Sequence, residues 1–349
     1  MQIQAIFSVT LLALLTAFGV GCGSQEGART ALTGKVGASG EVVVVCDDAI
    51  WDGVVGDSLR SIFDRPFPVL PQYEPWFKLV HLEPEAFDRF WKPHRNIVVL
   101  ELADRVDTQK AKVSIYKEKY SRDQIYVTGT ARRGDELASA LADQSQELVS
   151  VFHRAEVERY ADLIALDENE VIRAELGVRA QLELTVPRDA RWAKKNEEFL
   201  WIDRQLTRMK GGDNHDVQQG FFIYREPYVD DQQFSMSARL KARNAALRAH
   251  VSGRNPGSYM TTEMRYSPSY EDVVFKGQFA SELRGLWRIE GDFMGGPFYS
   301  LTLFDERSGD LVTVEGYAYA PYFEKREYMR EVEAIVRSLR WYETPLTQP

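Results

Sequence analysis

The segment that most constrains this chain is its first 21 residues, which contain no Asp, Glu, Lys or Arg. The mostly apolar run over residues 3–20 is too short for a comfortable membrane-spanning helix, but it has the length of a signal-peptide core. Three small residues, Gly-Val-Gly, then lead into Cys22. We therefore expect residues 1–21 to be a lipoprotein signal peptide that is removed, with lipid attached to Cys22.

Two features depart from the usual lipoprotein pattern. Gly19 stands where a leucine is common, and no Lys or Arg precedes the apolar run. An ordinary cleaved signal peptide and an N-terminal membrane anchor are the alternatives. The lipoprotein interpretation is favoured, because a cysteine directly after small residues at the end of such a run is rarely accidental. Two or more acyl chains on Cys22 would then hold the protein stably to a bilayer.

Residues 22–40 are expected to form the lipidated cysteine and a flexible tether, because small and polar residues dominate this stretch. A Gly-rich coil of about 18 residues has an end-to-end distance of about 25 Å. The chain has two cysteines, so lipidation of Cys22 leaves Cys46 without an intramolecular disulfide partner. Cys46 follows four valines, which indicates a buried strand and an unreactive thiol.

Composition describes a soluble globular protein, with 44% hydrophobic and 27% charged residues. The net charge of −9 lies entirely outside the uncharged signal segment. An acidic balance of this kind disfavours nucleic acid as a partner, and it disfavours a basic patch on anionic lipid. The 328 residues that follow the signal segment are enough for one large domain or two of ordinary size.

Apolar periodicity predicts an α+β protein (or α/β), with a mixed sheet covered by helices and two halves at residues 41–176 and 177–349. In the first half, the pattern predicts a helix from Asp48 to just before Pro66, a short helix from Pro84, and a long helix over residues 134–176 that breaks near Asp167. The strands expected there cover residues 42–46, 77–82, 97–102, 113–120 and 124–130.

The second half has a similar plan. A helix is expected over residues 236–251, and a last helix carries Tyr328, Val332 and Ile335 on its apolar face. The expected strands cover residues 180–186, 199–204, 220–224, 284–290, 298–305 and 311–320, with a hairpin turn at residues 308–310. Because each half ends in three strands and a helix, the pattern suggests that the two halves are similar and arose by duplication.

No motif in the chain supports catalysis or metal binding. Residues 56–59 spell Gly-Asp-Ser-Leu, a signature of lipases and esterases, but Ser58 lies inside a helical pattern and no histidine is placed to activate it. No two histidines have the spacing of metal ligands, so we expect no metal and no cofactor. The Gly- and Asp-rich residues 211–216 are expected to be a solvated hairpin tip.

Five residues are candidates for binding. Trp51 belongs to an aromatic set that could stack on glycans, although core packing is the commoner role of tryptophan. Arg95 and Asn96 lie at the entry to a strand, where side chains line clefts or cap a preceding helix. Gly295 and Gly296 lie in the connection at residues 291–297, which is either a tight link between two strands or a loop that contacts a ligand.

These residues also carry a family resemblance. The first segment that carries the resemblance contains Trp51, Gly53, Gly56 and Asp57. Five more segments follow along the chain: residues 70–75 (Leu-Pro-Gln-Tyr-Glu-Pro), 95–97 (Arg-Asn-Ile), 294–297 (Met-Gly-Gly-Pro), 319–321 (Tyr-Ala-Pro) and 325–326 (Lys-Arg). In this combination the chain resembles a family of envelope lipoproteins from Bacteroidetes that is known only as a domain of unknown function. The resemblance covers almost the whole chain after the signal segment. It implies a location in the cell envelope and no chemistry.

The sequence thus predicts a lipid-anchored envelope protein with a non-catalytic binding or scaffolding role in envelope assembly or maintenance. Its expected partners are the membrane, through Cys22, and an envelope protein. No Asp follows Cys22 directly, which favours the outer membrane, facing the periplasm. The lack of a catalytic motif in the sequence disfavours an enzymatic activity. A hydrolase of envelope lipid or glycan remains an alternative, as does a small-ligand carrier with an apolar cavity between the halves.

Overall fold

The computed structural model of the protein describes residues 34–103 and 110–343. These residues belong to one compact unit. Cys22, the expected signal peptide and most of the expected tether lie outside the described residues. None of the helices within residues 34–103 and 110–343 combines the length and the apolar character needed to cross a membrane.

The first half is built on a five-stranded sheet in the order β2-β1-β3-β5-β4. Four strands run parallel, and β4 pairs antiparallel with β5 at one edge, which confirms the hairpin expected there. The strands are β1 (Glu41–Val45), β2 (Lys78–Leu82), β3 (Asn96–Leu102), β4 (Lys112–Lys117) and β5 (Ile125–Ala131). The valines of β1 are buried on both faces, as its continuous apolar sequence predicted for a central strand.

The helices of the first half begin and end at other residues than the sequence pattern predicted. The helix expected from Asp48 is broken at Gly53, and the helix expected over residues 134–176 is divided in three. The helices are α1 (Asp48–Trp51), α2 (Val54–Phe63), η1 (Pro84–Ala86), α3 (Gly134–Asp143), α4 (Ser145–Ala165) and α5 (Glu170–Ala180). The break near Asp167 is confirmed, but Asn169 caps α5 by accepting the backbone N–H of Ile172.

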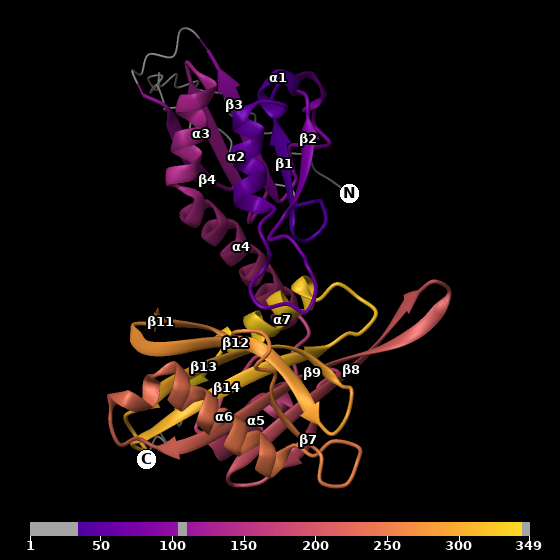
Figure 1. Cartoon of the computed structure of the whole chain (residues 1–349), viewed down its shortest axis with the longest axis vertical. Coiled ribbons are helices and arrows are strands. Elements are labelled where there is room, and N and C mark those ends of the chain that lie inside the picture. The colour runs from indigo at the N-terminus through magenta and orange to yellow at the C-terminus, as the bar shows by residue number, and fades with distance from the viewer. Residues whose placement is uncertain (1–33, 104–109, 344–349) are drawn as a thin grey trace, which may run out of the picture. The chain divides into compact units, whose positions relative to one another are not determined.

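The second half contains an eight-stranded antiparallel sheet in the order β10-β12-β13-β14-β9-β8-β7, with β11 also paired to β12 (Figure 1). Its strands are β7 (Arg191–Lys195), β8 (Phe199–Lys210), β9 (Asp213–Pro227), β10 (Tyr259–Thr262), β11 (Ser269–Phe275), β12 (Gln278–Glu290), β13 (Gly295–Asp305) and β14 (Asp310–Tyr319). A short pair, β6 (Leu182–Glu183) with β15 (Arg340–Trp341), replaces the longer strand expected over residues 180–186.

The expected meander is confirmed as β12, β13 and β14, with Gly309 at φ 74° in its second turn. The expected hairpin tip is also confirmed, because Gly211 and Gly212 have positive φ and join β8 to β9. Both strands of that hairpin are longer than the apolar pattern indicated. The mostly polar residues 205–218 continue the pairing beyond the apolar stretch, where periodicity carries little signal.

The α+β class is confirmed, but the two halves are not alike. The first sheet is mainly parallel, and α1 and α2 connect its parallel strands β1 and β2, whereas the second sheet is wholly antiparallel. The shared order of three strands and a helix therefore does not reflect a shared topology. Sequence pattern alone was misleading because it records the order of elements and not which strands pair.

Helices cover the two faces of the second sheet. α6 (Met236–His250) packs on one face with Phe222 and Phe298, while α7 (Arg326–Arg337) packs on the other face with Leu301 and Val314. The short helix η2 (Asp231–Phe234) precedes α6. α7 approaches the sheet closely at Gly316, because a Cβ at this position would lie 2.6 Å from the Cγ1 of Val332.

The first half contacts the second through the loop that follows α2. Glu74 in this loop is buried, and its carboxylate accepts the backbone N–H groups of Lys325 (2.6 Å) and Arg326 (2.7 Å) at the start of α7. The side chains of Arg326 and Arg330 donate to the carbonyl oxygens of Pro75 and Trp76, each at 2.7 Å. Glu74 thus caps a helix about 250 residues further along the chain.

We expect Glu74→Gln to lower the free energy of unfolding by about 1–3 kcal/mol, because an amide accepts these two N–H groups less well and brings an unmatched donor into a buried site. Urea denaturation of the Cys22→Ala protein measures the change. Glu324→Gln is the matched control, since Glu324 is an exposed carboxylate that pairs with Lys78. Loss of the ion pair between Glu324 and Lys78 should lower the free energy of unfolding by less than about 0.5 kcal/mol. Equal effects of the two substitutions would contradict the capping role.

Candidate binding cleft

The residues predicted to bind lie in three separate places. Trp51 is at the end of α1, where its ring stacks on His81 with the ring centres 4.8 Å apart and the guanidinium of Arg60 lies 4.8 Å from it. Gly56 must be a glycine here, because a Cβ would lie 1.8 Å from the Trp51 carbonyl oxygen. Packing alone thus accounts for the tryptophan and the glycine, and a binding role for Trp51 stays a prediction.

Arg95 and Asn96 lie at the opposite, amino-terminal end of the parallel sheet. Both donate to the buried carboxylate of Glu156 in α4, at 2.9 Å and 2.7 Å. Arg159 completes this group by donating to Glu156 (2.8 Å) and to the side-chain oxygen of Asn96 (3.0 Å). A buried carboxylate needs such partners, so these residues join β3 to α4. Neither the helix-capping role nor a ligand is required to explain them.

Gly295 and Gly296 line a cleft of about 930 Å³ in the second half. Its floor is formed by Leu286 and Trp287 of β12 together with the two glycines at the start of β13. Residues 262–266, which comprise the last residue of β10 and the segment after it, also line the cleft, as does the connection at residues 292–294. Pro71 also lines the cleft, from the same loop that carries Glu74.

The two glycines are required by the close approach of neighbouring strands. A Cβ on Gly296 would lie 2.1 Å from the carbonyl oxygen of Ala318, and one on Gly295 would lie 2.8 Å from that of Trp287. The indole N–H of Trp287 donates to the same Ala318 carbonyl at 3.3 Å. The tight strand connection expected from the sequence is therefore present, and it lies in the cleft.

Three of the charged side chains that line the cleft, Glu263, Arg265 and Arg288, interact with one another. The carboxylate of Glu263 accepts the backbone N–H (2.9 Å) and the guanidinium (2.8 Å) of Arg265, and Arg288 lies 3.8 Å away. The hydrogen bonds from Arg265 lower the pKa of Glu263 to about 2. Glu263 is therefore ionised at neutral pH and suited to accept hydrogen bonds rather than to donate a proton.

Apolar side chains are exposed along the rim of the cleft. Phe293 is fully exposed in the β12–β13 connection, and Met264 and Tyr266, which also line the cleft, are about half exposed. Large apolar residues that are exposed together next to a cleft are typical of surfaces that bind a partner.

A buried ion pair supports the wall behind the cleft. Arg243 of α6 donates two hydrogen bonds of 2.8 Å to Glu315 of β14, and both side chains are fully buried. The same guanidinium donates to the hydroxyl of Thr262 at 2.9 Å. Burial raises the pKa of Glu315, and Arg243 opposes this shift. Thr262, which lines the cleft, is thus held by side chains inside the domain.

The other motifs of the sequence form no reactive site. Ser58 lies in α2 and its hydroxyl donates to the Ala138 carbonyl at 3.1 Å. Cys46 is buried as predicted, and burial raises the pKa of its thiol to about 12. Within the part of the chain that the structure describes, no three His, Cys, Asp or Glu side chains are grouped to hold a metal ion.

Comparison with protein families divides the chain between residues 165 and 169. Residues 35–165 match a domain of unknown function, DUF8532, and residues 169–338 match another, DUF4837. Each matched range covers less than half of the chain, and we refer to the two ranges as the DUF8532 and DUF4837 domains after the families that they resemble. The two matches confirm the chain's resemblance to an uncharacterised family. The two matched ranges meet between residues 165 and 169, and the boundary expected at residues 176–177 stays a prediction.

No curated protein matches the chain. Among solved structures, a point mutant of the protein Mog1 matches 48% of this chain and 93% of its own length, with 9% sequence identity and a TM-score of 0.30. A likeness of this size assigns neither fold nor function.

Two of the segments that carried the family resemblance, residues 70–75 and 325–326, meet where the DUF8532 and DUF4837 domains contact each other. Residues 72–75 contact residues 325–326 through Glu74, and the amino group of Lys325 donates to Gln72 at 3.2 Å. Residues 294–297 approach Ala318 next to Tyr319. Sequence reasoning missed the cleft residues Glu263 and Arg265, because nothing in their local pattern distinguishes them from an ordinary surface loop.

We expect Gly296→Ala to destabilise the DUF4837 domain by about 1–3 kcal/mol, since the added methyl group would overlap the Ala318 carbonyl and force β13 from β14. Thermal unfolding measures the change. Gly34→Ala is the control, because a Cβ at Gly34 has no neighbour within 4 Å. A Gly296→Ala protein as stable as the Gly34→Ala protein would contradict the close approach.

Stability should also depend on pH through Glu263. Its pKa in the folded protein lies below the ordinary value of 4.5, so its contribution is fully present above about pH 4.5 and is lost as the pH falls toward 2. The difference in unfolding free energy between the native protein and Glu263→Gln should therefore shrink over this range. NMR titration of the Glu263 carboxyl carbon gives a direct check, and a midpoint near 4.5 would contradict the pairing with Arg265.

Proposed function

We propose that this protein is a membrane-anchored envelope lipoprotein with a non-catalytic binding or scaffolding role, and that it binds a polypeptide partner at the cleft beside Gly295 and Gly296. The observation that carries this proposal is the cleft itself, which lies in the DUF4837 domain, is also lined by Pro71 of the DUF8532 domain, and has exposed apolar side chains on its rim.

The proposed location rests on the sequence. The short apolar signal segment would direct export and be removed, and lipid on Cys22 with the stretch of small residues before β1 would then hold the two domains next to a bilayer. The absence of an Asp directly after Cys22 favours the outer membrane, with the domains facing the periplasm. The acidic charge of the chain is compatible with a protein partner and disfavours nucleic acid.

The chemistry of the cleft supports binding rather than catalysis. Glu263 is held ionised by Arg265, so it is a poor proton donor at neutral pH. Phe293, Met264 and Tyr266 line the cleft and offer an exposed apolar contact area. Exposed aromatic side chains next to paired charges are typical of sites that bind proteins. In such sites a few apolar side chains supply most of the binding free energy.

Crosslinking in intact cells followed by affinity purification tests both parts of the proposal. The native protein is compared with Cys22→Ala, which removes the anchor, and with Phe293→Ser, which removes the most exposed anchor of the cleft. Val274→Ser is the matched control, because Val274 is equally apolar and highly exposed on β11 but does not line the cleft.

We expect one envelope protein to be recovered with the native protein and the Val274→Ser protein. Its recovery should fall at least tenfold with Phe293→Ser, and Cys22→Ala should release both from the membrane fraction. Recovery of the protein alone in every form would overturn the scaffolding role. Equal recovery with Phe293→Ser and Val274→Ser would move the binding site away from the cleft.

A further inference from the structure

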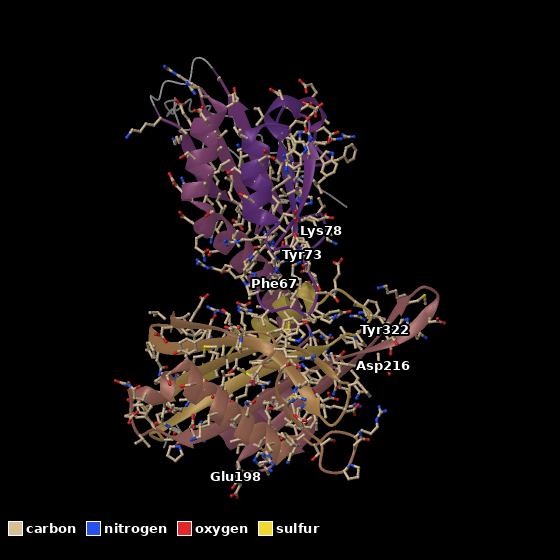
Figure 2. The ribbon with its side chains drawn as sticks, viewed as in Figure 1. Phe67, Tyr73, Lys78, Glu198, Asp216 and Tyr322 are labelled. Atoms are coloured by element: carbon tan, nitrogen blue, oxygen red, sulfur yellow. The ribbon has the colours of Figure 1, made fainter. Side chains whose placement is uncertain are left out.

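A second surface, separate from the cleft, is formed by the outer part of the β8–β9 hairpin. β7 pairs with β8 only as far as Asp203, and β14 pairs with β9 only from Gln218 onward. Residues 205–217 therefore continue as a two-stranded ribbon past both neighbouring strands (Figure 1). Figure 2 shows Asp216 on this ribbon and Tyr322 beside it.

One face of the ribbon is held by the loop that follows β14. The ring of His215 packs against that of Tyr322 with centres 4.3 Å apart, and Leu206 and Val217 pack with Ala320. Isolated two-stranded hairpins are marginally stable in water. These contacts therefore hold the ribbon in place, although most side chains of residues 207–216 are exposed.

The edge of β8 is open along the ribbon. Gly211 and Gly212 form a two-residue turn, so the pair Lys210 and Asp213 that flanks it is hydrogen-bonded. Alternation along β8 then directs the backbone N–H and C=O groups of Thr207 and Met209 away from β9. The backbone groups of Asp203 point away from β9 in the same way, and Asp203 pairs with Arg191 of β7 on that side. Thr207 and Met209 are thus next in line for an added strand.

This open edge is positively charged. Residues 205–210 contain Arg208 and Lys210 and no acidic residue. Within residues 34–103 and 110–343, neither of these two side chains forms an ion pair. Arg208 donates to the carbonyl of Thr207, and Lys210 donates to that of Tyr322. The acidic residues Asp213 and Asp216 belong to β9, one strand further from the edge.

We propose that the β8 edge from Gln205 to Met209 receives an extended acidic segment of a partner protein as an additional strand, in line with β7. Main-chain hydrogen bonds to Thr207 and Met209 supply the pairing, and alternate carboxylates of the added strand face Arg208 and Lys210. A second copy of this chain is disfavoured as the occupant, because two β8 edges would bring these cations together.

The probe is a synthetic peptide of alternating Thr and Glu, ten residues long, titrated into the Cys22→Ala protein at low salt. Backbone NMR shifts should move at Thr207 and Met209. Thr207→Pro removes one outward N–H and leaves the pairing with β9 intact, so it should weaken binding about tenfold. Asn214→Pro is the matched control, because it removes an outward N–H from the opposite edge of the same ribbon.

Charge reversal provides a second, independent measurement if the proline variant fails to fold. Arg208→Glu should abolish binding of the Thr-Glu peptide and should create binding of a Thr-Lys peptide. Undiminished binding to Thr207→Pro, or equal loss with Asn214→Pro, would overturn the proposal. Self-association in sedimentation that is lost with Thr207→Pro would also overturn it, since the occupant would then be a second copy.

Discussion

The arrangement of the two domains depends on one carboxylate placed at the end of one helix. The first N–H groups of α7 have no partner within the helix, and the residue before α7 provides no side-chain cap. Glu74 accepts two of these N–H groups from a position inside the DUF8532 domain, where it also opposes the positive end of the helix dipole. α7 covers one face of the DUF4837 sheet. The contact with Glu74 therefore joins the two domains and also fixes the orientation of α7 on that sheet.

The interface beyond this cap is unusually polar. Glu333 of α7 accepts from His153 of α4 and from Arg284 of β12, each at 2.9 Å. Burial opposes the ionisation of Glu333, but Arg284 and His153 outweigh it and lower its pKa. Buried charges are costly unless every partner is present, so such a network favours one relative placement of α4, α7 and β12 over others. This interface also fixes one part of the cleft, because Pro71, which lines the cleft, belongs to the loop that the interface holds in place.

Two surfaces remain available once the domains are joined. The cleft has exposed apolar residues around paired charges, whereas the β8 edge beyond Asp203 has no neighbouring strand in the described part of the chain and carries cations. The two surfaces suit different partners, since apolar anchors fill pockets and open edges add strands. Neither requires a reactive group, which agrees with a chain whose Ser58 and Cys46 are both engaged in structural roles.

Local patterns in the sequence determined the elements and much of their extent. The valines of β1, the meander of β12 to β14, the turn at Gly309 and the hairpin tip at Gly211 follow from period-two alternation and from glycine's freedom at positive φ. Periodicity failed where its signal is weak, as in the polar ribbon of β8 and β9, and at Gly53, where one apolar stripe runs through two helices.

Only the tertiary structure decided which distant residues meet. The sequence contained Glu74 and Lys325 within recognisable segments, but no local rule relates a loop to a helix terminus about 250 residues later. The same holds for Arg95, Asn96 and Glu156, whose pairing depends on where α4 crosses the sheet. Strand order, the difference between the two sheets and the cleft are likewise set by long-range pairing and close packing, because hydrogen bonds and ion pairs depend on position in space and not on distance along the chain.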